Sequence, residues 1–221
     1  MTAHDVARLL PEVPALRDFC RSMAVLEAIL SPDWESRHHS FGAGWAPGEE
    51  MASMRNGSGD EYSIVFVAGG AYVRGFDHEA VMSPYGNDGP WPGVLDSVPD
   101  VFRRCVEEPA FRDEDGMPVV TACLWREAVD DAWRVGEIDY PDGEGDPDGS
   151  AYLFALLTDP SPEAFQRFAE DYYEMPVDLD AIRHVLALRP LTQAVVTALN
   201  ADLTLEDLAE DLAEARYPAL A

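Results

Sequence analysis

The segment EYSIVFVAGGAYVRGFD, residues 61–77, decides the fold of this chain. Two runs rich in Tyr, Val, Ile and Phe flank Gly69 and Gly70, and a glycine pair accepts the positive φ angles of a tight hairpin turn. In the first run, both sets of alternating residues are apolar, which is typical of a strand that is covered on both faces. In the second run, Arg74 indicates that one face is more exposed to solvent. The segment therefore predicts a β-hairpin in the core, with Ile64 and Phe66 buried.

Further helical and strand patterns lie on both sides of this hairpin. Apolar residues recur at helical spacing from residue 14 to residue 30, and four capped helical segments follow residue 150. The predicted helix starts are Ser161, either Asp178 or Asp180, Thr192, and Thr204 with Asp207. Further strands are predicted at residues 34–41, 49–55, 118–126 and 132–138. The predicted class is α+β: a mixed, mainly antiparallel sheet of about five strands with an N-terminal helix and a C-terminal cluster of about four helices.

An acidic break, EIDYPDGEGDPDGS at residues 137–150, is the clearest boundary in the chain. It separates glycine-punctuated strand patterns from segments that begin with helix caps. The predicted organisation is a sheet domain at residues 1–138, an acidic linker at 139–149, and a helical subdomain at 150–221 packed on the sheet domain. We expect the linker to be exposed and irregular between Asp142 and Asp148.

The charge balance is strongly acidic, with 42 acids, 15 bases that are all Arg, and a net charge of −27. This excess argues against direct binding to nucleic acid. Cys20, Cys105 and Cys123 are widely spaced without a CxxC pair, which favours reduced, buried thiols over a disulfide framework or a zinc site. The N-terminus lacks signal-peptide features, and no window approaches a membrane span of ~20 apolar residues. We therefore expect a cytoplasmic protein without membrane contact.

One acidic motif overlays half of a calcium-binding loop. Glu144, Asp146 and Asp148 alternate before Gly149, but Ala155 stands where the closing bidentate Glu belongs. These three carboxylates are weak metal-ligand candidates, and the segment is predicted to be a solvated linker that holds no metal.

The exit of the hairpin carries the other candidate site. Asp77, His78 and Glu79 follow the second strand, and an imidazole there can act as a general base or bind a metal with carboxylate help. The alternative is a turn histidine between two solvated acids. His38 and His39, if they lie in a strand, point to opposite faces. The glycine-rich turns lack the spacing of a nucleotide-binding loop, so no cofactor is predicted.

Three segments carry a resemblance to known proteins: MRNGSGDEY at residues 54–62, the AGGAY turn, and WPGVLD at residues 91–96. They are similar to segments of an uncharacterised family of bacterial proteins, which implies no particular activity or site residues. The plan of an N-terminal helix and a central antiparallel sheet in an acidic protein also resembles the α+β SUKH-type toxin-immunity superfamily. That likeness implies a protein-binding role.

The leading functional prediction is a non-enzymatic, immunity-like acidic protein that presents a negative surface to a basic protein partner. The first alternative is a small metal-assisted hydrolase that uses His78 with nearby carboxylates. The second alternative is a structural protein that its acidity keeps in solution. A catalytic His78 requires a concave pocket and a carboxylate or a second imidazole within reach, whereas a binder requires His78 only to sit on an open surface.

Overall fold

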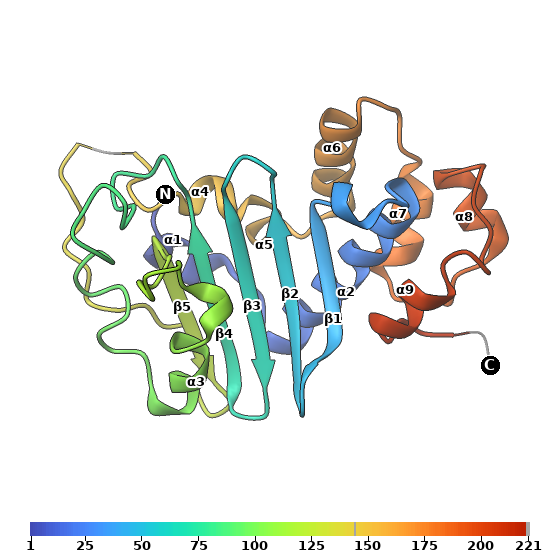
Figure 1. Ribbon diagram of the computed structural model, residues 1–221. Coiled ribbons are helices and arrows are strands. Elements are labelled where there is room, and N and C mark those ends of the chain that lie inside the picture. The colour runs from blue at the N-terminus through green and yellow to red at the C-terminus, as the bar shows by residue number, and fades with distance from the viewer. Residues whose placement is uncertain (144, 220–221) are drawn as a thin grey trace. The chain divides into compact units, whose positions relative to one another are not determined.

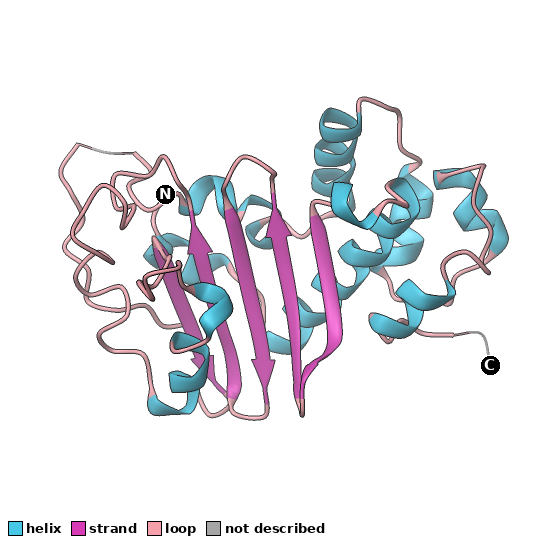
Figure 2. Ribbon diagram, viewed as in Figure 1, coloured by secondary structure: helices cyan, strands magenta, loops and turns pink. Residues whose placement is uncertain are grey.

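The protein is an α+β structure whose five strands form one antiparallel sheet (Figures 1 and 2). The computed structural model describes residues 1–143 and 145–219. The strands lie in the order β1-β2-β3-β4-β5, so each pairs with its neighbour in sequence. This confirms the predicted class. The strands are β1 (His39–Ala46), β2 (Glu49–Arg55), β3 (Glu61–Val67), β4 (Gly70–Phe76) and β5 (Ala122–Glu127).

Helices stand before, between and after the strands, and the longest two are α2 and α6. The α-helices are α1 (Ala3–Leu9), α2 (Val13–Leu30), α3 (Arg103–Val106), α4 (Ser150–Leu153), α5 (Ala155–Thr158), α6 (Pro162–Tyr173), α7 (Leu179–Leu186), α8 (Gln193–Leu199) and α9 (Ala209–Glu214). Short 3-10 turns are η1 (Trp34–Ser36), η2 (Asp100–Phe102) and η3 (Pro109–Phe111). None of the helices in the described part of the chain combines the length and apolarity of a membrane span.

The chain divides into two compact units, each made of two separate stretches of sequence. The first unit contains Met1–Val13 and Ser53–Thr158, and the second contains Pro14–Ala52 and Asp159–Ala221. The predicted acidic linker, residues 139–149, lies within the first unit.

The central hairpin forms as predicted, but its turn lies one residue earlier. Val67 pairs with Gly70, so the loop is Ala68-Gly69, and neither loop residue has a positive φ. The predicted glycine-pair turn is therefore wrong. Gly70 instead begins β4 with φ 137°, and a Cβ there would lie 2.0 Å from the carbonyl oxygen of Arg126 on β5. A glycine is needed at position 70 because the backbone of β5 approaches closely there, and not because of the turn.

The two hairpin strands form the core of the first unit. All of β4 is buried, and β3 buries Tyr62, Ile64 and Phe66. The predicted wetter face at Arg74 is wrong, because its side chain is only 2% exposed. Its Nε donates to the carbonyl of Val119 at 2.7 Å and one Nη donates to Glu61 at 2.7 Å, which offset part of the cost of burying the charge. The other Nη has no hydrogen-bond partner among the described residues.

Three predicted strands differ from the structure. The strand predicted at residues 118–126 begins only at Ala122. Residues 34–36 form η1, because the side chain of Asp33 caps the backbone N–H of Glu35, and β1 begins only at His39. The segment predicted as a strand at residues 132–138 makes a single bridge, in which Arg134 and Trp125 exchange both backbone hydrogen bonds. The turn from Glu127 to Asp130 and a close backbone approach of Gly136 to Gly93 limit the pairing to this one bridge.

The second unit packs α6 on α7 and α7 on α8. Three predicted N-caps are confirmed, since Ser161, Asp178 and Thr192 accept hydrogen bonds from the first turns of α6, α7 and α8. The predicted cap at Thr204 bonds Asp207 as expected, but turns follow it and the helix itself begins at Ala209. The buried core includes Phe165, Ile182, Val185, Val196 and Leu199.

Candidate functional site

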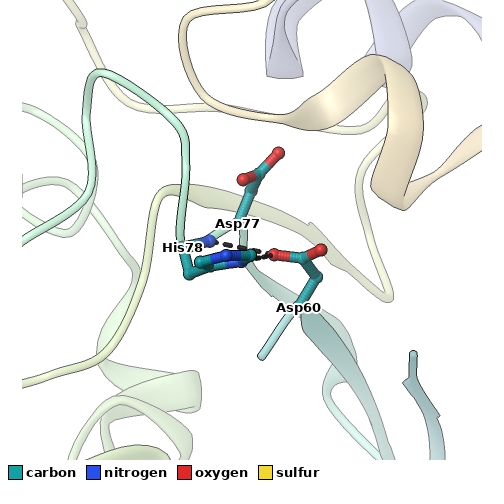
Figure 3. A group of neighbouring side chains, drawn as sticks. All are labelled: Asp60, Asp77 and His78. Atoms are coloured by element: carbon teal, nitrogen blue, oxygen red, sulfur yellow. Dashed lines mark hydrogen bonds and ion pairs between the residues drawn. The ribbon is translucent and has the colours of Figure 1, made fainter. Parts of the chain in front are cut away.

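An aspartate–histidine pair lies at the open end of the β3–β4 hairpin (Figure 3). Asp60 immediately precedes β3, and one of its carboxylate oxygens accepts both the backbone N–H of His78, at 2.9 Å, and its ring Nδ1–H, at 2.7 Å. The side chain of Asn56 donates to the other oxygen at 2.5 Å. Asp60 is nearly buried, whereas the side chain of His78 is 41% exposed. With Nδ1 bonded to the carboxylate, the neutral ring carries its lone pair on Nε2.

Asp77 adds a second carboxylate to this pair. One of its oxygens accepts the backbone N–H groups of Glu79, at 2.9 Å, and Ala80, at 3.0 Å, which orients the side chain. One ligand atom from each of Asp60, Asp77 and His78 lies within 4.8 Å of the other two. Figure 3 shows the carboxylate of Asp77 standing apart from the hydrogen-bonded pair. The described residues thus bring together two carboxylates and one imidazole.

The charges of the three groups depend on one another. The hydrogen bond from Asp60 raises the pKa of His78 above its ordinary value. Burial raises the pKa of Asp60, but the hydrogen bonds from His78 and Asn56 outweigh it and hold that pKa below its ordinary value. Burial and the negative charges of Asp60 and Asp146 raise the pKa of Asp77. A positive charge placed among these groups would therefore be stabilised.

The acidic break bends back toward Asp77, although the sequence predicts it to be exposed. Asp148 is buried, its side chain accepts the backbone N–H groups of Ala3, at 2.9 Å, and Ser150, at 3.1 Å, and its exposure is 0%. The prediction of an exposed segment from Asp142 to Asp148 is thus wrong at Pro147 and Asp148, which are both buried. The preceding described residues do lack helix and strand, as predicted. At Gly149, with φ 73°, a Cβ would lie 2.3 Å from the side chain of Asp77.

Of the candidate ligands in the acidic break, neither Asp146 nor Asp148 belongs to the group of ligand atoms found among the described residues. Asp146 accepts the backbone N–H of Ala151 at 2.9 Å, and Asp148 is committed to the contacts above. Glu144 lies outside the described residues. Glu79 is exposed and contributes its backbone N–H, not its carboxylate, to the Asp77 turn. Of the predicted candidates, the cluster contains Asp77 and His78.

Asp60 is the site residue that the sequence reasoning missed. The signal was the hairpin register: Glu61 pairs with Phe76, so the next residues outward, Asp60 and Asp77, face each other. A loop at Gly69-Gly70 would instead have placed Glu79 opposite Asp60. Because the turn was predicted one residue too late, the sequence predicted the wrong acidic residue opposite Asp60.

A second buried polar cluster lies in the second unit, around Glu27 of α2. Its side chain is 0% exposed and accepts hydrogen bonds from the ring Nδ1 of His39, at 2.8 Å, from the backbone N–H of His38, at 3.1 Å, and from the hydroxyl of Tyr173. The predicted opposite orientation of the two histidines is wrong, since both rings pack on Phe168. His38 precedes β1, so the alternation of a strand does not apply to it.

The pKa values of Glu27 and His38 are lowered in this cluster, whereas burial and the charge of Glu27 raise the pKa of Tyr173. Burial alone raises the pKa of Glu27, but the hydrogen bonds from His39, Tyr173 and His38 outweigh it and hold the pKa below its ordinary value. Burial, together with the charge of His39, lowers the pKa of His38 to about 4. The ring Nδ1 of His38 has no hydrogen-bond partner among the described residues. Because the Glu27 carboxylate is enclosed and accepts three hydrogen bonds, we assign this cluster to stability and not to catalysis.

No protein-family model, curated protein or solved structure matches this chain. The resemblances named above therefore remain predictions, and the chemistry of the residues carries the functional argument.

Proposed function

We propose that the first unit binds a divalent cation through Asp60, Asp77 and His78, and that this site supports metal-assisted hydrolysis. The observation that carries the proposal is the grouping of three potential ligand atoms within 4.8 Å. Carboxylate oxygen and imidazole nitrogen together suit cations such as Mn²⁺ and Zn²⁺. A cation bound there would activate water and polarise a carbonyl or phosphoryl oxygen.

The chain's own residues have distinct roles in this proposal. Asp60 fixes the orientation of the His78 ring through its 2.7 Å contact with Nδ1. The exposed ring of His78 either contributes a ligand nitrogen or takes a proton from an attacking water. The turn at Glu79 and Ala80 holds Asp77 in place through two backbone N–H groups. His78 thus has the carboxylate partner that catalysis requires, on a more open surface than a closed active site provides.

Titration with Mn²⁺ or Zn²⁺ by calorimetry tests the cation site. We expect saturable one-to-one binding that His78→Gln and Asp77→Asn each weaken by at least tenfold, because each removes one ligand charge or nitrogen. Asn retains the oxygen that accepts the two turn N–H groups, so the fold should survive. Binding should also weaken as pH falls, since a proton competes for His78, whose pKa Asp60 raises.

Glu79→Gln is the matched control for Asp77→Asn, because it removes the same charge two residues away without touching the cluster. Equal losses in both variants, or no saturable binding by either metal at millimolar concentration, would contradict the site. Hydrolysis is tested separately with chromogenic carboxylate and phosphate esters. If the protein binds a cation but hydrolyses none of these esters, the metal-binding site is supported and the hydrolase function is rejected.

A second candidate function, binding of a basic protein partner, is favoured by the end of α6. Cations normally stabilise a helix C-terminus, yet α6 has no basic residue in its last turn, and Glu170, Asp171 and Glu174 are exposed there. The neighbouring Tyr172 is 41% exposed and Met175 is 37% exposed. An aromatic anchor inside an acidic rim is the composition that a basic partner would recognise.

Two double variants of equal charge test this surface: Asp171→Asn with Glu174→Gln at the C-terminal end of α6, and Glu206→Gln with Glu210→Gln near α9. The probes are an arginine-rich peptide and proteins rich in Lys and Arg, measured by interferometry at low and high salt. We expect binding that weakens steeply with salt and that the α6 variant weakens more than the α9 variant. Equal effects of the two variants would reject α6 as the contact surface, and absence of binding would reject the partner.

A further inference from the structure

An arginine-lined hollow lies in the first unit, apart from the Asp60 cluster. It has a volume of about 570 Å³ and is open to solvent, within the size range of small-ligand sites. One wall is a face of α1 with the spacing i, i+3, i+4, and the other is the segment that follows β5. The lining residues are His4, Ala7, Arg8, Leu10, Glu12, Arg126, Asp131, Ala132, Trp133, Arg134 and Val135.

Positively charged side chains are concentrated in this hollow, although the protein as a whole is strongly acidic. The net charge of the whole protein is −27, yet three of its 15 bases, Arg8, Arg126 and Arg134, line this one cavity. The ion pairs of Arg8 with Asp5 and of Arg134 with Asp131 involve exposed side chains, and pairs of that kind contribute little. Arg134 also lies 3.7 Å from Asp130, whose side chain is 19% exposed. Arg8 can therefore turn toward a bound anion at small cost, and Arg134 can do so by giving up its long contact with Asp130.

Arg126 is the fixed member of the group. Its side chain is 10% exposed, and its Nε and one Nη donate to the carbonyl of Asp130 at 3.3 Å each. The same Nη contacts the carboxylate of Glu12 at 2.7 Å, although the Glu12 side chain is 70% exposed. A guanidinium that is nine-tenths buried needs a counter-charge, and here a solvated surface carboxylate supplies it.

The wall beside Arg126 is rigid. Trp133 is 5% exposed, and its indole N–H donates to the carbonyl of Pro11 at 2.8 Å. This bond ties the segment after β5 to the residues that carry Glu12. An incoming anion can thus replace the Glu12 carboxylate without rearranging the cavity.

We propose that this hollow binds the oxyanion of a small phosphorylated or carboxylated molecule, which displaces Glu12 from Arg126 and is flanked by Arg8 and Arg134. Glu12 occupies the anion position in the free protein. The exchange replaces one anionic partner of Arg126 by another, and the planar guanidinium fork can bind two oxygens of either a carboxylate or a phosphate group. This site is independent of the proposed cation site.

Titration with inorganic phosphate and with succinate, followed by ¹H–¹⁵N spectra, tests the proposal. The Trp133 indole N–H is the local reporter, and the Trp91 indole N–H, which donates to the carbonyl of Asp139, is the reference within the same unit. We expect a saturable shift of Trp133 with no matching shift of Trp91. The probe that saturates at the lower concentration identifies the phosphate or the carboxylate as the preferred group.

The substitutions should act in opposite directions. Glu12→Gln removes the competing carboxylate and should tighten binding about two- to fivefold, the range expected for an exposed ion pair. Arg134→Gln should weaken binding by a similar factor, and Arg126→Gln should weaken it about tenfold or more. Arg134 is 54% exposed, so its variant should fold even if that of Arg126 does not.

Glu107→Gln and Arg103→Gln are the charge-matched controls, because this pair is exposed elsewhere in the first unit. They should leave both titrations unchanged. The proposal is overturned if Trp133 shows no saturable shift with either probe up to about 50 mM, a limit that corresponds to a binding free energy of roughly 2 kcal/mol. It is also overturned if Glu12→Gln fails to tighten binding, or if the controls change affinity as much as the variants of the hollow.

Discussion

Replacing Glu27 by Ala should lower the free energy of unfolding by about 3 to 5 kcal/mol. The substitution leaves the ring Nδ1 of His39, the hydroxyl of Tyr173 and the backbone N–H of His38 without their common acceptor. Each unsatisfied buried donor costs about 1 to 3 kcal/mol, so the total exceeds the effect of an ordinary surface substitution. Chemical denaturation at neutral pH, with fluorescence and circular dichroism as probes, measures the loss.

Glu27→Gln separates hydrogen bonding from charge in this network. Gln keeps one acceptor oxygen but presents an NH₂ group to at least one of the three donors, so its effect should lie between those of wild type and Ala. Glu210→Ala, an exposed acid in α9 of the same unit, should change stability by less than about 0.5 kcal/mol. A loss below about 1 kcal/mol for Glu27→Ala would show that water or alternative partners satisfy the network.

Replacing Phe66 by Ala should also destabilise the protein by about 3 to 5 kcal/mol. Phe66 lies on β3 opposite Ala71 and is 5% exposed, so truncation removes a large apolar side chain and leaves a cavity beside a small neighbour. The neighbouring strands are paired along their length and restrict collapse into that space. Equilibrium unfolding in urea measures the change, with the slope of the transition as a check on two-state behaviour.

Val129→Ala provides the contrasting control in the same unit. Val129 is 91% exposed, and its truncation should change stability by less than about 0.5 kcal/mol. Comparable losses in the two variants would mean that the β3–β4 hairpin is not the packed centre of the first unit.

The functional candidates were predicted from the sequence in part. Asp77 and His78 follow a strand whose position the pattern made plain, and they belong to the cluster. Asp60 was missed because side-chain partners across a hairpin depend on the register, which a one-residue difference in the turn changes. Arg126 and Glu12 are 114 positions apart in the chain, and no local pattern connects them.

The sequence by itself determined the α+β class, the central hairpin, three helix caps and the acid excess, because periodicity, capping and charge are local properties of the chain. Tertiary structure alone decided that Gly70 meets the Arg126 carbonyl and that Asp148 is buried against the N-terminus. It also decided that Glu27, on a helix with an otherwise ordinary core pattern, accepts three hydrogen bonds. A charged side chain can be buried when distant residues supply its partners, and those distant contacts are what a local pattern does not encode.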